Sequence, residues 1–122
     1  MSEKKWTPGP WEAICSQESE YEGTRLVTAE VYTEKVRADM PGRGYRDDPH
    51  RVDNVSVCRV SAFQNDLSVE EIHAVTHLIA AAPDLYEALE AIMTSVGHGQ
   101  GVSGSEWRAA RVAMAKARGE QQ

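Results

Sequence analysis

The sequence is poor in cysteine, with only Cys15 and Cys58 among its 122 residues. The two lie far apart and show no metal-ligand spacing, so neither a zinc site nor a disulfide framework is indicated. We expect both to be small buried side chains or inert thiols, as free cysteines commonly are in a reducing compartment.

Long apolar runs are also missing. No run approaches the ~18–20 residues that a membrane-spanning helix needs, and residues 1–5 lack the apolar core of a secretion signal. We therefore expect a cytoplasmic protein without membrane contact.

Basic residues are in deficit, since the net charge is −6. General binding to nucleic-acid phosphates needs a basic surface, so nucleic acid is not an expected partner. The same charge allows an acidic face that meets a basic protein.

Standard catalytic signatures are absent. The glycine-rich stretch 97–104 has neither a Walker lysine nor an alternating strand–helix setting, so we interpret it as a flexible connector. His73 and His77 are four residues apart, so both could bind one metal ion from the same face of a helix. The sequence offers no third ligand at a spacing typical of a metal site. Polar surface histidines are the preferred interpretation. We expect no metal, no cofactor and no catalytic residue, and hence a protein that is not an enzyme, with a small enzyme as the remaining alternative.

Two apolar helical runs are present, and they meet at Pro83. The first begins with a capping box, Ser68 followed by Glu71. Pro83 cannot donate a backbone hydrogen bond and suits the first turn of a helix, so one helix should end there and a second begin. Apolar side chains of the second run recur at helical spacing and are expected to form much of the core. They are Leu85, Leu89, Ile92, Met93 and Val96.

Strand-like stretches precede the helices. Alternation or β-branched residues predict strands over Trp11 to Ser16, Arg25 to Val36 and Val55 to Phe63. The polar segment Gln17 to Gly23 is interpreted as a turn or a long hairpin loop, and residues 37–54 as a long loop.

These elements predict a single α+β domain over residues 1–122. A small antiparallel sheet of three or four strands, within about residues 11–63, should precede two or three helices, within about residues 68–118, broken at Pro83.

A last helix is predicted from Ser103, which forms a second capping box with Glu106, to about Arg118. Its apolar stripe is narrow and could pack on its own domain or on a second copy. We expect a homo-oligomer formed through this C-terminal helix. The stripe consists of Trp107, Ala110, Met114 and Ala117.

Cationic side chains are the candidates for binding. The 37–54 loop carries Arg43, Arg46, His50 and Arg51, whose forked or ring donors suit phosphate or carboxylate. Aspartates are interleaved with them, so a loop that neutralises its own charges is the alternative.

A second candidate lies in the last helix, where Trp107 stands beside Arg108, with Arg111 one turn on. This set could stack on a base and hold a phosphate. The alternative is that Trp107 packs against the core of its own domain or lies in a dimer interface.

Two motifs carry a family resemblance: Thr7-Pro-Gly-Pro-Trp11, and the segment Leu78 to Leu89 with the sequence LIAAAPDLYEAL. Together with the Ala/Lys/Arg-rich ending they resemble a large set of small phage and prophage proteins. Where that set usually has Asn-Ala-Arg before the Leu-Ile, this chain has Val75-Thr76-His77.

The resemblance implies a phage accessory or anti-defence protein in the bacterial cytoplasm. Sponges that oppose Thoeris signalling are similar in size and layout, and they sequester cyclic nucleotides without cleaving them. By this analogy we expect capture of a cyclic nucleotide or another phosphorylated small molecule. The expected ligand-binding residues are Arg46, Arg51, His77, Trp107 and Arg108.

The alternative is an acidic protein–protein inhibitor of a host defence complex of CRISPR or restriction type. Its acidic contacts would come from Glu18, Glu20 and Glu22.

Overall fold

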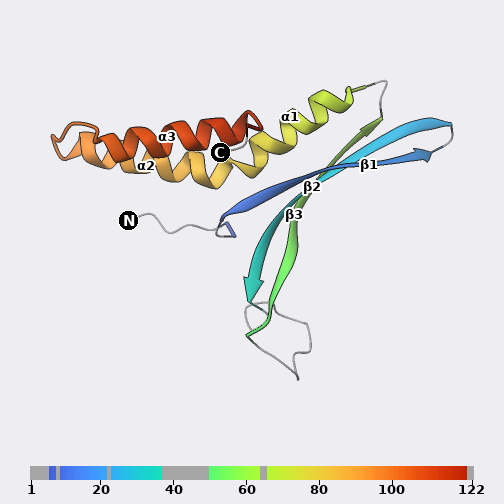
Figure 1. Cartoon of the computed structure of the whole chain (residues 1–122), viewed down its shortest axis with the longest axis horizontal. Helices are drawn as coiled ribbons and strands as arrows, with labels where there is room; N and C mark the ends of the chain where they lie inside the picture. The colour runs from blue at the N-terminus through green and yellow to red at the C-terminus, as the bar shows by residue number, and fades with distance from the viewer. Residues whose placement is uncertain (1–5, 8, 22, 37–49, 64–65, 121–122) are drawn as a thin grey trace.

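The computed structural model describes residues 6–7, 9–21, 23–36, 50–63 and 66–120. Three strands come first and three helices follow, as Figure 1 shows. The strands are β1 (Trp11–Tyr21), β2 (Thr24–Val36) and β3 (Val52–Phe63), and the helices are α1 (Val69–Ala80), α2 (Ala82–Gly97) and α3 (Gly104–Ala117). The predicted α+β class is confirmed.

The three described strands form one antiparallel sheet in the order β1-β2-β3. The predicted turn over Gln17 to Gly23 is wrong for most of its length, because β1 continues to Tyr21 and pairs with β2 to its end. An edge strand with a solvated face tolerates polar residues, which hides it from a search for apolar alternation. The chain reverses at Gly23, whose φ of 78° suits glycine.

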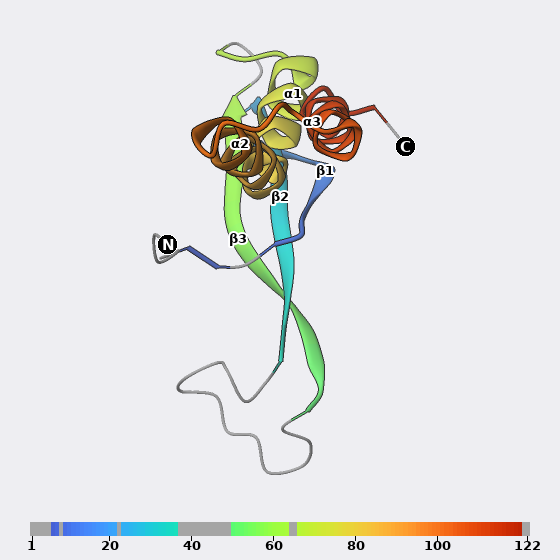
Figure 2. The same ribbon diagram turned by 90° about the vertical axis from the view of Figure 1, so that its left-hand side faces the viewer.

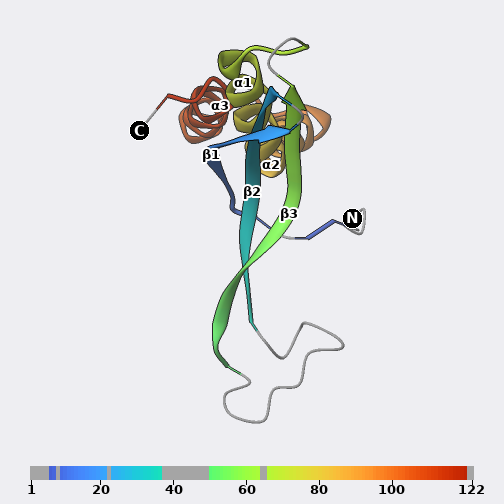
Figure 3. The ribbon, with the colours of Figure 1, turned by 90° about the vertical axis from the view of Figure 1, so that its right-hand side faces the viewer.

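β3 begins at Val52, inside the segment predicted as a loop. Its first residue pairs with Val36 at the end of β2, so β2 and β3 form a long twisted ribbon that Figure 3 shows extending away from the helices. Residues 37–49 of the predicted loop lie outside the described residues.

α1 packs on the sheet and forms the core with it. The N-cap and capping box predicted at Ser68 are confirmed, with Glu71 N donating to Ser68 Oγ over 3.1 Å. Ile72 is 0% exposed and lies in a cluster with Val27 and Ala29 of β2. One turn further on, the buried Thr76 hydroxyl donates to the Ile72 carbonyl over 2.6 Å, so this polar side chain is satisfied within α1.

The helix break at Pro83 is also confirmed. α1 ends at Ala80, and the buried Pro83 lies in the first turn of α2. From there α2 and α3 form an antiparallel hairpin that extends beyond the sheet (Figures 1 and 2).

The expected core role of the α2 stripe is wrong for Leu89, Met93 and Val96, which are exposed. The buried residues of the hairpin are small, with Ala88 on α2 and Ala113 on α3. Alanine lets two helices approach closely, so the hairpin closes on its alanines and leaves the larger side chains outside.

The N-terminal motif packs on the corner where α1 meets α2. Trp6 lies edge-on to Tyr86, with ring centroids 4.7 Å apart. The indole nitrogen of Trp11 donates to the Thr7 carbonyl over 3.1 Å, and a Cβ added at Gly9 would stand 3.2 Å from Pro83 Cβ. The two motifs that carry the family resemblance therefore meet in space.

We expect the substitution Ile72→Ala to lower the free energy of unfolding by about 2–5 kcal/mol, because it opens a cavity between α1 and the sheet. Urea denaturation followed by circular dichroism measures this change. The matched control is Val75→Ala on the same helix, which should cost less than about 1 kcal/mol because Val75 is 40% exposed. Equal losses in the two variants would contradict the assigned core.

Candidate functional site

α3 is fixed at both of its ends. At its start the predicted capping box is confirmed: Glu106 N donates to Ser103 Oγ, and Ser103 N donates to Glu106 Oε1, each over 3.2 Å. Ser95 of α2 also donates to Glu106, at 2.9 Å and 2.8 Å to its two carboxylate oxygens. At the other end Lys116 Nζ lies 2.6 Å from Asp84 Oδ2 of α2. The hairpin is thus held by polar contacts at its tip and at its base.

The Glu106 carboxylate is stabilised in its charged form. Hydrogen bonds from the Ser95 hydroxyl, and then from Ser103, hold the pKa of Glu106 below its ordinary value. The sequence indicates the Ser103 contact through the capping-box pattern. It gives no signal for the Ser95 contact, because that pairing depends on how the two helices align.

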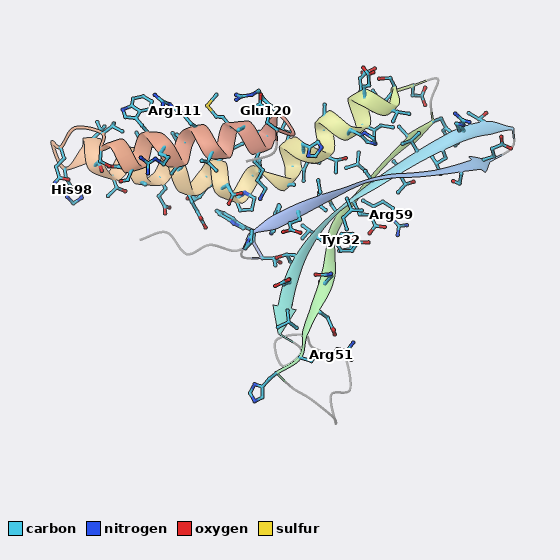
Figure 4. The ribbon with its side chains drawn as sticks, viewed as in Figure 1. Tyr32, Arg51, Arg59, His98, Arg111 and Glu120 are labelled. Atoms are coloured by element: carbon cyan, nitrogen blue, oxygen red, sulfur yellow. The ribbon has the colours of Figure 1, made fainter. Side chains whose placement is uncertain are left out.

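Trp107, Arg108 and Arg111 form the outward side of α3, which we call the cationic ridge. All three are exposed, and the exposed fraction of Trp107 is 53%. Arg111 follows Trp107 by four residues and Arg108 by three, so the side chains are neighbours on the helix surface. Figure 4 shows Arg111 on the side of the hairpin that faces away from the sheet.

The two ridge arginines have no ion-pair partner within the part of the chain that the structure describes. Guanidinium groups bind phosphate and carboxylate through forked hydrogen bonds, and an indole ring stacks on bases. The ridge can therefore hold an anion that carries an aromatic group.

A groove of about 520 Å³ runs between α2 and α3 beside Arg108. Its floor is apolar, formed by alanines and Val112, while Asp84, Glu87 and Glu106 lie on its rim. Lys116 pairs with Asp84, and the serine hydroxyls engage Glu106. The groove is less suited to an anion than the ridge, because carboxylates outnumber cations on its lining.

The other predicted binding residues lie elsewhere. Arg51 stands at the far end of the β2–β3 ribbon, remote from α3 in Figure 4, and its Nε is 3.1 Å from Asp53 Oδ1. This ion pair agrees with the alternative interpretation of that segment, in which its arginines are neutralised by its own aspartates. Arg46 lies outside the described residues. Within one chain the structure places Trp107, Arg108 and Arg111 together on α3, as the sequence predicts for this set.

His77 lies half-buried on α1 beneath the turn that ends α3. A Cβ added at Gly119, whose φ is 79°, would come within 2.9 Å of the imidazole Cδ2 of His77. This close approach explains why glycine suits the position, and it places His77 in a packing role apart from the cationic ridge.

The described residues contain no group of three or more side chains that could hold a metal ion. His73 Nε2 is buried and finds no hydrogen-bond partner among them. Cys58 is half-buried on β3, and burial raises the pKa of its thiol, as expected for an inert cysteine. The side chain of Cys15 lies outside the described residues.

Sequence reasoning missed a polar cluster on the sheet face opposite α1. Arg59 Nη2 lies 3.4 Å from Glu30 Oε1. A hydrogen bond from the Tyr32 hydroxyl holds the pKa of Glu30 below its ordinary value and raises that of Tyr32. The alternation of Glu30, Tyr32 and Glu34 along β2 was the available signal.

The fold and the ridge together define a class: a small α+β protein whose helical hairpin presents an aromatic and cationic surface. The model of the family described as Salmonella phage P22 protein Y8K6 matches residues 1–121, so the chain belongs to this phage protein family. No curated protein and no solved structure matches the chain significantly. In the described part of the chain, no helix combines the length and the apolar character needed to cross a bilayer.

We expect Glu106→Gln to lower the melting temperature near pH 7 and to have little effect near pH 3. A carboxylate whose folded pKa is depressed contributes stability above its unfolded pKa of about 4.3, and that contribution is lost as the pH falls through the folded pKa. Thermal unfolding of both proteins across this range measures the difference.

Glu87→Gln is the control for this prediction, because Glu87 also lies on the groove between α2 and α3 and the substitution removes the same charge. A melting-temperature difference for Glu106→Gln that does not change with pH would contradict the assigned role of the charge.

Proposed function

We propose that this phage protein captures a phosphorylated small molecule, of the nucleotide-messenger class, on the cationic ridge of α3 and holds it without cleaving it. Such capture would remove a defence signal from the infected host. Membership of a phage protein family supports the phage setting, and the ridge supports the binding chemistry.

The observation that carries the proposal is the contrast among the basic side chains. Arg51, Arg59 and Lys116 each lie within ion-pair distance of a carboxylate. Arg108 and Arg111 stand side by side without such a partner in the described part of the chain, next to an exposed indole. Two adjacent unpaired guanidinium groups favour an external anion.

The ridge offers complementary contacts for a nucleotide. The arginines would donate to phosphate oxygens, and the indole of Trp107 would stack on the base. Neither kind of contact abstracts a proton or supplies a nucleophile, so the ligand would be released unchanged.

Isothermal titration calorimetry with cyclic dinucleotides and cyclic ADP-ribose isomers tests the proposal. We expect at least one ligand to bind with a micromolar or lower Kd. Arg108→Ala and Arg111→Ala should each weaken that binding by about 10–100-fold, because a hydrogen bond to a charged group contributes roughly 1.5–3 kcal/mol. Chromatography of the ligand after incubation should recover it intact.

The matched control is Arg118→Ala, because Arg118 caps the same helix but lies 2.9 Å from Glu120. This variant should bind like the wild type. The absence of binding heat at high micromolar ligand would contradict capture, and conversion of the ligand would replace capture by catalysis.

A second candidate function, inhibition of a host defence protein, is favoured by the sheet face opposite α1. Strand alternation and register place Glu12 opposite Tyr32, with Glu30 and Glu34 on either side of that tyrosine along β2. Figure 4 shows Tyr32 and Arg59 on the side of the sheet that faces away from α1. This acidic patch suits a basic protein surface. Of the acidic contacts predicted from the sequence, Glu20 is exposed on β1, and the side chains of Glu18 and Glu22 lie outside what the structure describes.

Affinity purification from host lysate separates the two candidates. Under inhibition, a stoichiometric host protein should be recovered with the wild type and with Arg111→Ala. It should be lost with the double variant Glu12→Lys and Glu34→Lys, which reverses charge on the acidic patch. Recovery of no stoichiometric protein would remove this candidate.

A further inference from the structure

α2 exposes a row of large apolar side chains along the hairpin. The exposed fractions of Leu89, Met93 and Val96 are 57%, 64% and 57%. Together with Tyr86, they follow one another at intervals of three, four and three residues. This alternation is the spacing of helix seams that pack against other helices in coiled coils and four-helix bundles.

α3 presents a second row with the same spacing. Trp107, Ala110, Met114 and Ala117 are also separated by three, four and three residues. Met114 is 53% exposed. The row predicted from the sequence as an oligomer contact is therefore largely uncovered in the single chain.

The two rows lie on the same side of the hairpin. The groove between the helices is lined by Glu87 and Ala91 from α2 and by Arg108 and Val112 from α3. These residues therefore identify which side of each helix faces the groove. At about 100° per residue, the two apolar rows fall on the side opposite this groove. We call their shared surface the apolar seam. It comprises Leu89, Met93, Val96, Ala110 and Met114.

The seam faces away from the sheet and carries no charge. Figure 4 places Arg111 at the upper border of α3, remote from the sheet, and helical spacing puts Met114 on the same side. None of the seam residues is acidic or basic. A contiguous apolar surface of this kind on a small protein marks an interaction site.

The charges that flank the seam suit a second copy of the same chain. Glu90 precedes Met93 by three residues on α2, and Arg111 precedes Met114 by three residues on α3, so each charge borders the seam. Neither residue lines the groove on the opposite side. In a two-fold symmetric contact, the α2 of each copy lies against the α3 of the other, so that each acidic border meets a basic one.

We infer that the apolar seam binds the apolar seam of a second copy, so that two α2–α3 hairpins form a four-helix bundle at the centre of a dimer. The two sheets then lie on the outer sides of the bundle, since each seam faces away from its own sheet. Trp107 lies between the seam and the arginines, so it borders both the dimer contact and the cationic ridge.

Light scattering coupled to size exclusion, with the full chain and no ligand, tests this inference. At tens of micromolar the wild type should show twice the 13.5 kDa mass of one chain. Leu89→Glu should raise the dimer dissociation constant by at least about 100-fold, because two-fold symmetry places two glutamates in the apolar contact. This variant should then elute as a monomer.

Val112→Glu is the matched control, since it introduces the same charge on the groove side of the same hairpin, where Val112 is also exposed. It should remain a dimer. Circular dichroism should show that both variants keep their helices, because each replaced side chain is exposed in the single chain. A monomeric wild type, a dimeric Leu89→Glu variant, or equal dissociation of both variants would overturn the inference. Because no nucleotide is present, the outcome is independent of the proposed ligand binding.

Discussion

The burial of Ile72 against Val27 and Ala29 couples the helical half of this protein to its sheet. α1 brings one large side chain to the centre of the sheet, and the partly buried Val60, Ala62, Leu67 and Val69 surround it. The hairpin of α2 and α3 extends beyond this contact, so its position depends on α1. A core of this size leaves much of the apolar surface of the helices outside, and that remaining surface determines how the protein can associate.

The local structure was predictable where one short pattern determines it. Ser68 and Ser103 each specify a helix start through a hydroxyl and a glutamate three residues on, and both caps form as predicted. Pro83 specifies the break because it cannot donate a backbone hydrogen bond. The full length of β1 was not predictable, because its outer half is polar and depends on pairing with β2.

Which apolar face is covered could not be predicted, because periodicity shows that a helix has such a face without showing what lies against it. The α2 stripe was expected in the core, yet Leu89 and Met93 are exposed while Ala88 is buried. The candidate site was partly predictable for the same reason. Trp107 and Arg108 are neighbours in the sequence and remain neighbours on the helix, whereas the position of Arg51 depends on the direction of the ribbon.

The two motifs of the family resemblance serve architecture. Gly9 and Pro83 come from different motifs and lie against each other at the corner between α1 and α2. Thr76, at one of the positions where this chain departs from the usual pattern, is buried and bonded within α1. The resemblance at these motifs therefore reflects how α1 and α2 are joined, whereas the candidate binding residues lie on α3.

The two polar contacts that bridge α2 and α3 have a consequence for engineering. Because Asp84 with Lys116 and Ser95 with Glu106 hold the helices from both ends, the exposed Gly101 between them contributes little to keeping the pair together. That exposed position is a natural place to insert a fluorescent or affinity domain. A fusion there would report on the intact hairpin and would leave both termini and the sheet undisturbed.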